Sequence, residues 1–202
     1  MKGLLLKDII NLKQQGKIYL LMLGIWMAIG FVNKNGDYFG GIMMMLTVVV
    51  PISAIAYDEK AKWDRYALTM PVSRKDIVLS KYILAAVCAV VGAFLSEIVS
   101  VIITKKPMES LMTSLLYFSL GLIFASIVLP VIFKFGVEQG RLLMLAVILV
   151  PTALTMTLSK AGVPLPSEET VQRAVTFSPA AAVLLIILSA IVSTRIYRRK
   201  EF

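Results

Sequence analysis

Six long apolar runs, separated by short charged connections, restrict what this sequence can fold into. An α-helix needs about 20 consecutive apolar residues to cross the hydrocarbon core of a bilayer. We expect membrane spans at residues 18–32, 38–57, 82–103, 111–133, 142–158 and 177–194. The first run is the shortest, so its flanking polar residues must reach the interface or the bilayer must thin around it. The pattern predicts an all-α integral membrane protein with six transmembrane helices.

The composition agrees with this fold class along the whole chain. Hydrophobic residues make up 58% of the sequence and charged residues 16%, against roughly 45–50% and about 25% in soluble domains. Six spans of about 20 residues use about 120 positions, which leaves no room for a soluble enzymatic domain. We therefore expect residues 1–202 to form a single transmembrane domain.

The distribution of basic residues predicts the orientation in the membrane. If the connections alternate between the two sides, 16 of the 21 Lys and Arg residues fall on the side of the N-terminus and five on the other. Cytoplasmic connections carry such an excess. An even number of spans then places both termini in the cytoplasm. We also attribute the net charge of +9 to contact with an anionic membrane and not with nucleic acid.

Three segments outside the spans have patterns of their own. Residues 2–16 place Leu5, Ile9 and Leu12 on one helical face, which predicts an amphipathic helix lying in the cytoplasmic interface. Residues 58–76 form the longest cytoplasmic connection and alternate acids with bases. On the outer side, Ser167 is followed by two acidic residues, which predicts the start of a short helix ahead of the last span.

Several function classes lack the residues that they require. The chain contains no His and one Cys, Cys88, so we expect no His or Cys metal site and no histidine-assisted nucleophile. It also has no GxxxxGK[ST] loop for phosphates. We expect a chain that is not an enzyme and that binds no cofactor by itself.

Glu97 is the one ionisable side chain inside an uncharged run. An acidic group at that depth is costly and usually faces a polar partner or a cavity. It could carry a proton or contact a substrate along a translocation path with Ser96 and Ser100, or it could simply hydrogen-bond to a neighbouring helix. A second feature is the run Met43 to Met45, since flexible thioether side chains can accommodate varied apolar molecules.

The connection 58–76 has the pattern of a helix, a stop and a new helix start. Pro71 cannot continue a helix, so residues 59–69 can form a short helix along the membrane surface. Ser73 is followed at the third position by Asp76, a spacing similar to a capping box, which predicts the start of the next span. Trp63 and Tyr66 would give the short helix aromatic contacts for a soluble partner.

The same connection carries a resemblance to a known family. From Leu68 to Tyr82 it reads Leu-x-x-Pro-Val-Ser-Arg-Lys-x-Ile-Val-x-x-Lys-Tyr, after an acidic pair and an aromatic residue. This run resembles the first cytoplasmic loop of permease subunits of bacterial ATP-binding-cassette (ABC) exporters, in the small six-span branch of the type-two permease superfamily. The resemblance implies a bacterial plasma-membrane protein that pairs with a second permease, as a homo- or heterodimer.

The resemblance also implies separate ATPase subunits that hold ATP and Mg and that drive export of amphipathic peptides or toxic apolar compounds. The residues that it assigns to coupling with the ATPase are Asp58, Glu59, Trp63, Asp64, Arg65, Tyr66, Pro71, Ser73 and Arg74. Two other functions stay open from the sequence. One is a proton-coupled secondary transporter that uses Glu97, and the other is a non-transporting immunity or scaffold protein.

Overall fold

The computed structural model describes residues 2–67, 69, 72–160 and 168–199, and these residues form helices joined by short connections. The helices in chain order are α1 (Lys2–Lys13), α2 (Gly16–Asn33), α3 (Asp37–Lys60), α4 (Trp63–Ala67), α5 (Arg74–Thr104), α6 (Pro107–Phe135), α7 (Val137–Lys160) and α8 (Glu168–Arg198). Six of them, α2, α3, α5, α6, α7 and α8, are long and apolar enough to cross a membrane. The all-α, six-span prediction is confirmed.

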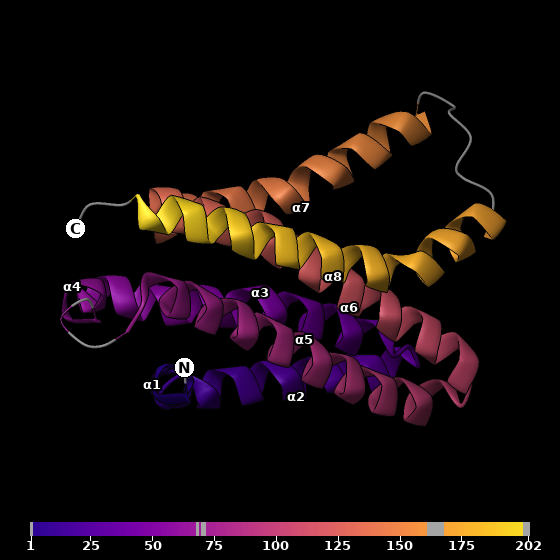
Figure 1. Ribbon diagram of the computed structural model, residues 1–202. Coiled ribbons are helices and arrows are strands. Elements are labelled where there is room, and N and C mark those ends of the chain that lie inside the picture. The colour runs from indigo at the N-terminus through magenta and orange to yellow at the C-terminus, as the bar shows by residue number, and fades with distance from the viewer. Residues whose placement is uncertain (1, 68, 70–71, 161–167, 200–202) are drawn as a thin grey trace.

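The long helices run side by side, with α6 packed against α3, α5, α7 and α8 (Figure 1). Both ends of the chain and α4 lie at one end of the bundle, which we call the α4 end (Figure 1). The apolar core contains fully buried side chains from α5 and α6, among them Val78, Val128 and Ile132.

Small residues allow close helix contacts within the bundle. A Cβ atom added at Gly92 of α5 would lie 3.3 Å from Met43 of α3. One added at Gly121 of α6 would lie 3.2 Å from Thr47 of α3. The helix α3 therefore approaches both neighbours at positions that have no side chain.

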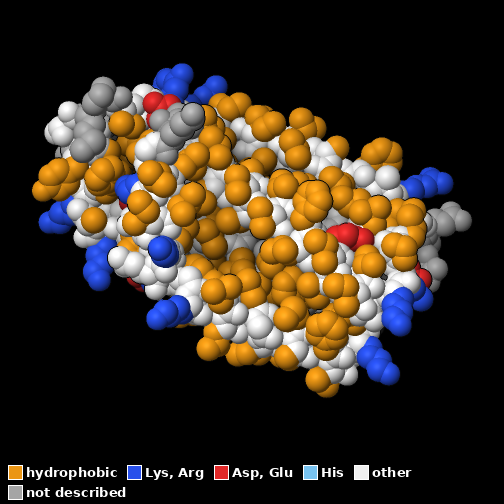
Figure 2. Space-filling model, turned by 90° about the horizontal axis from the view of Figure 1, so that it is seen from below, with side chains coloured by type: hydrophobic (Ala, Val, Ile, Leu, Met, Phe, Trp, Pro, Cys, Tyr) orange, Lys and Arg blue, Asp and Glu red, His pale blue; other side chains and the backbone are white. Residues whose placement is uncertain are grey.

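The surface has the distribution that a membrane protein requires. In Figure 2 hydrophobic side chains cover the middle of the visible face, and Lys and Arg side chains gather at its two ends. Large apolar side chains on α2, α7 and α8 are exposed, including Leu20, Leu149 and Leu188. Such a surface is stable against lipid or a partner subunit and not against water.

Three boundaries differ from the sequence predictions. The helix predicted for residues 2–16 ends at Lys13. The predicted outer helix is not separate, because α8 runs without interruption from Glu168 to Arg198 and includes the last span. The polar residues that follow Glu168 form the first turns of the same helix, so the chain does not break before the apolar span. Ser167, the predicted N-cap, lies outside the described residues. The short helix predicted for residues 59–69 is also shorter, because α3 continues to Lys60 and α4 contains five residues.

Candidate functional site

Four ionisable side chains meet at the α4 end and form what we call the charge cluster: Lys7, Asp8, Asp58 and Lys81. They come from α1, from the last turn of α3 and from the second turn of α5. The Nζ atom of Lys81 lies 2.7 Å from Oδ1 of Asp8 and 2.6 Å from Oδ2 of Asp58. The ammonium of Lys7 pairs with the other oxygen of Asp58 and lies 3.3 Å from Oδ1 of Asp8.

Three of the four members of the charge cluster are buried, and Lys7 is partly exposed. Asp8 is 0% exposed, Lys81 2% and Asp58 5%. Removing single charges from water costs several kcal/mol each, and here two cations offset two anions, so the cluster carries no net charge. Because its members lie on three segments far apart in the sequence, the pairs fix α1 to the end of α3 and to the start of α5.

The helix α4 packs directly onto this cluster. The ring centroid of Trp63 lies 4.6 Å from Nζ of Lys7, within the range of a cation–π contact. Ala67 is fully buried, whereas Tyr66 is 64% exposed. Lys62, in the turn between α3 and α4, adopts a left-handed conformation with φ 51°. The turn and the buried contacts therefore hold α4 in place with Tyr66 directed outward.

The start of α5 is capped as the sequence predicts. The side-chain oxygen of Ser73 accepts a hydrogen bond from the backbone N–H of Asp76 at 3.1 Å. The carboxylate of Asp76 accepts the backbone N–H of Ser73 in return, which completes the capping box. Arg74 donates to the backbone carbonyl of Arg198 at 2.7 Å, which ties the start of α5 to the end of α8.

Two of the acids assigned to ATPase docking, Asp58 and Glu59, have other partners in the structure. Asp58 is not an exposed docking group, because it is buried and both of its oxygens are paired within the chain. Glu59 is exposed, and its Oε2 accepts the first backbone N–H of α7, from Val137, at 3.1 Å. Asp64 and Arg65 belong to α4, but their side chains lie outside the described part of the structure, as does the whole of Pro71.

The three residues predicted along a translocation path do not converge on one site. Oε2 of Glu97 accepts a hydrogen bond from Ser114 of α6 at 2.8 Å. Ser96 is buried and donates to the carbonyl of Ala93 on its own helix. Ser100 is buried and donates to Ser110 of α6 at 3.2 Å. Each side chain thus has a partner of its own, and two of the three pairs join α5 to α6.

The sequence reasoning missed the paired roles of Asp8, Lys7 and Lys81. One signal was present, since Asp8 is the sole acid in residues 2–16 and lies on the same side of the helix as Leu4, which is also buried.

Within the described residues, no group of three His, Cys, Asp or Glu side chains could hold a metal ion.

Comparison with known families gives a match over nearly the whole chain. The model of a family described as ABC-2 family transporter protein matches residues 3–198, which is almost the whole chain. A comparison with curated proteins finds no match.

Proposed function

Because the chain belongs to the ABC-2 family of transporter membrane proteins, we propose that it forms the translocation path of an exporter and receives its driving force at the α4 end. The chain is a multi-pass membrane permease of an ABC-type transporter, and members of this family work with ATPase subunits. In this proposal the ATPases are separate chains that hold ATP and Mg, and a second permease completes the path.

The placement of α4 carries the proposal. A short helix that transmits motion must be held firmly on the permease side and offer a free side chain on the other. Trp63 and Ala67 hold α4 on the permease, and Tyr66 is the exposed side chain on the other side. Since the charge cluster joins α1, α3 and α5 directly behind α4, a displacement of α4 would move these helices together.

An ATPase can shift the permease between two conformations only if it binds them with different affinity. In this proposal the closed ATPase pair favours one position of α4, and ATP hydrolysis releases that preference. The two ends of the chain lie with α4 at the same end of the bundle (Figure 1). This position and the excess of basic residues support a bacterial plasma-membrane protein with both termini and α4 in the cytoplasm.

The cargo belongs to the proposal as well. An exporter of amphipathic peptides or toxic apolar compounds suits a bundle whose long helices expose apolar side chains to the bilayer. A proton-coupled carrier is less well supported, because Glu97 is hydrogen-bonded to Ser114.

Co-purification tests the proposal. The tagged chain is extracted from its native host, and the recovery of an ABC ATPase is compared between wild type, Tyr66→Ala and Phe177→Ala. Phe177 is a matched control because its ring is 72% exposed on α8, far along the chain from α4. We expect Tyr66→Ala to lower the recovery of the ATPase and Phe177→Ala to leave it unchanged. Equal recovery from all three would contradict docking at α4.

A further inference from the structure

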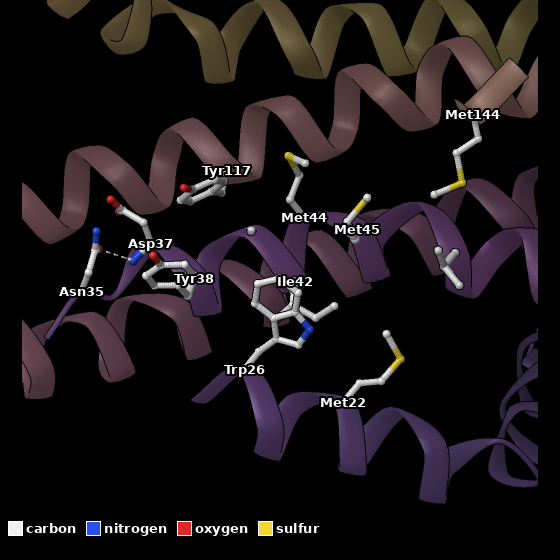
Figure 3. Close-up of a pocket in the computed structure, with 12 residues that line it drawn as sticks. Met22, Trp26, Asn35, Asp37, Tyr38, Ile42, Met44, Met45, Tyr117 and Met144 are labelled. Atoms are coloured by element: carbon white, nitrogen blue, oxygen red, sulfur yellow. Dashed lines mark hydrogen bonds between the residues drawn. The ribbon is translucent and has the colours of Figure 1, made fainter. Parts of the chain in front are cut away.

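The structure contains a groove that the coupling mechanism does not use. It has a volume of 580 Å³ and is lined by residues of α2, α3, α6 and α7 (Figure 3). Four methionines line it, Met22, Met44, Met45 and Met144. Flexible, polarisable thioethers fill irregular spaces and adapt to apolar surfaces of different shape. Most of the groove is therefore suited to an apolar body and not to one rigid ligand.

One end of the groove is different. Figure 3 shows Asp37, Tyr38 and Tyr117 around that end, and the ring of Trp26 from α2 lies beside Ile42 next to them. Electron-rich ring faces attract organic cations, and a carboxylate beside them adds a full negative charge. The groove thus combines an acidic, aromatic end with an apolar body.

The carboxylate of Asp37 is available to a ligand. The side chain is exposed, and no Lys or Arg side chain in the described part of the chain lies within 4 Å of it. The main chain at Asp37 is held in place, since its N–H donates to Oδ1 of Asn35 at 2.8 Å. Although the protein has a net charge of +9, the carboxylate of Asp37 attracts cations to this end of the groove.

The aromatic part is also held in position. The ring of Tyr117 rests on the backbone of α3 at Gly40, where an added Cβ atom would lie 2.4 Å from the ring. Glycine is required for this approach. The ring is therefore fixed by packing before any ligand arrives, which lowers the entropy lost on binding.

The groove has the dimensions and the direction of an amphiphile in a bilayer. Asp37 is the first residue of α3, at the end of the span, and Val49 lines the groove deeper in the same helix. At about 1.5 Å per residue these positions are separated by about 18 Å along the helix axis. A charged head at the membrane boundary would leave its apolar tail along the methionines.

We propose that this groove binds an amphipathic organic cation, with its ammonium or guanidinium group at Asp37 between the aromatic rings and its apolar body against the methionines. The ligand enters from the bilayer and is the class of molecule that the permease moves. The role of this ligand as cargo rests on the proposed transport function, but binding of the ligand to the groove needs neither ATPase nor ATP.

The experiment measures binding to the isolated full-length chain in micelles of a neutral sugar detergent. Trp26 lies in the groove, so its fluorescence in a Trp63→Phe background reports occupancy. The titrant is dodecyltrimethylammonium, compared with a neutral alcohol and a phosphocholine of the same chain length. We expect a saturable change with the cation and at least tenfold weaker binding of the other two. A Trp26→Phe variant that keeps Trp63 should lose the response.

Variants at the acidic end decide the assignment. Asp37→Asn should weaken binding of the cation at least tenfold, whereas Asp37→Glu, which keeps the charge, should retain it within about threefold. Glu109→Gln is the matched control, since Glu109 is an exposed acid outside the groove with Lys106 as its partner.

Three results would overturn the proposal. Equal affinity for the neutral alcohol would show an unselective apolar surface. Equal affinity for the phosphocholine would assign the groove to bulk lipid, and the absence of any saturable response would indicate that another helix surface or a second copy covers it. Because ATPase and ATP are absent, each of these failures is separate from a failure of ATPase docking at α4.

Discussion

Replacing Lys81 by Met is the most informative perturbation of the charge cluster. The methionine has a similar length but no charge, so Asp8 and Asp58 would be left with Lys7 as their sole cationic partner in the cluster. Breaking a buried pair by removing one partner typically costs about 3–5 kcal/mol, because an uncompensated charge remains. We expect a loss of this size in the free energy of unfolding, since Lys81 contacts both carboxylates and is 2% exposed.

The assay is equilibrium unfolding in mixed micelles with an increasing fraction of sodium dodecyl sulfate, followed by tryptophan fluorescence. The double variant Lys81→Met with Asp8→Leu removes one charge of each sign and leaves the pair between Lys7 and Asp58. We expect it to recover most of the lost stability, because a neutral cluster is restored. The matched control is Lys106→Met, whose pair with Glu109 is exposed and is worth less than about 1 kcal/mol.

Two results of the unfolding assay would refute this reasoning. If Lys81→Met unfolds at the same detergent fraction as the wild type, the cluster does not hold the three helices together. If the double variant is as unstable as the single one, the loss comes from packing and not from an unpaired charge.

Three further predictions concern the cap, a helix contact and the acid inside a span. Ser73→Ala removes the capping box of α5 and should cost about 1 kcal/mol of stability in the same unfolding assay; an unchanged midpoint would contradict this. Gly40→Ala should cost about 1–3 kcal/mol because its Cβ atom collides with the ring of Tyr117, whereas Gly41→Ala, which meets nothing within 4 Å, should be nearly neutral. Glu97→Gln keeps a hydrogen-bonding side chain and should leave ATP-driven export and the amount of protein in the membrane unchanged, and a drop in export at normal abundance would favour the proton-carrier alternative.

The span count and the start of α5 were predictable because both depend on local sequence. Hydropathy over about 20 residues reports whether a helix can cross a bilayer, and the spacing of Ser73 and Asp76 reports a cap. The continuity of α8 was not predictable in this way. A helix that begins with acidic residues and then turns apolar has the same local pattern whether or not the chain breaks between the two parts.

The charge cluster could not be predicted from local patterns. Asp8 and Lys81 are 73 positions apart, and their pairing depends on how α1 lies against α5. From the sequence, Lys81 counts as one of many basic residues beside a span, and Asp58 as an exposed acid in a loop. In the structure both residues are buried and form an ion pair inside the bundle. Which residues are buried depends on how the helices pack.

Cross-linking from α4 tests the central claim most directly. The chain has a single cysteine, so a Cys88→Ser background allows one new thiol to be placed at Tyr66→Cys or, as a control, at Phe177→Cys. A short thiol-to-amine cross-linker is applied to membranes of the native host, and the products are identified by mass spectrometry. We predict that Tyr66→Cys gives a covalent adduct with an ABC ATPase and that Phe177→Cys gives none. An adduct from Phe177→Cys alone, or none from either position while the ATPase is present, would contradict coupling through α4.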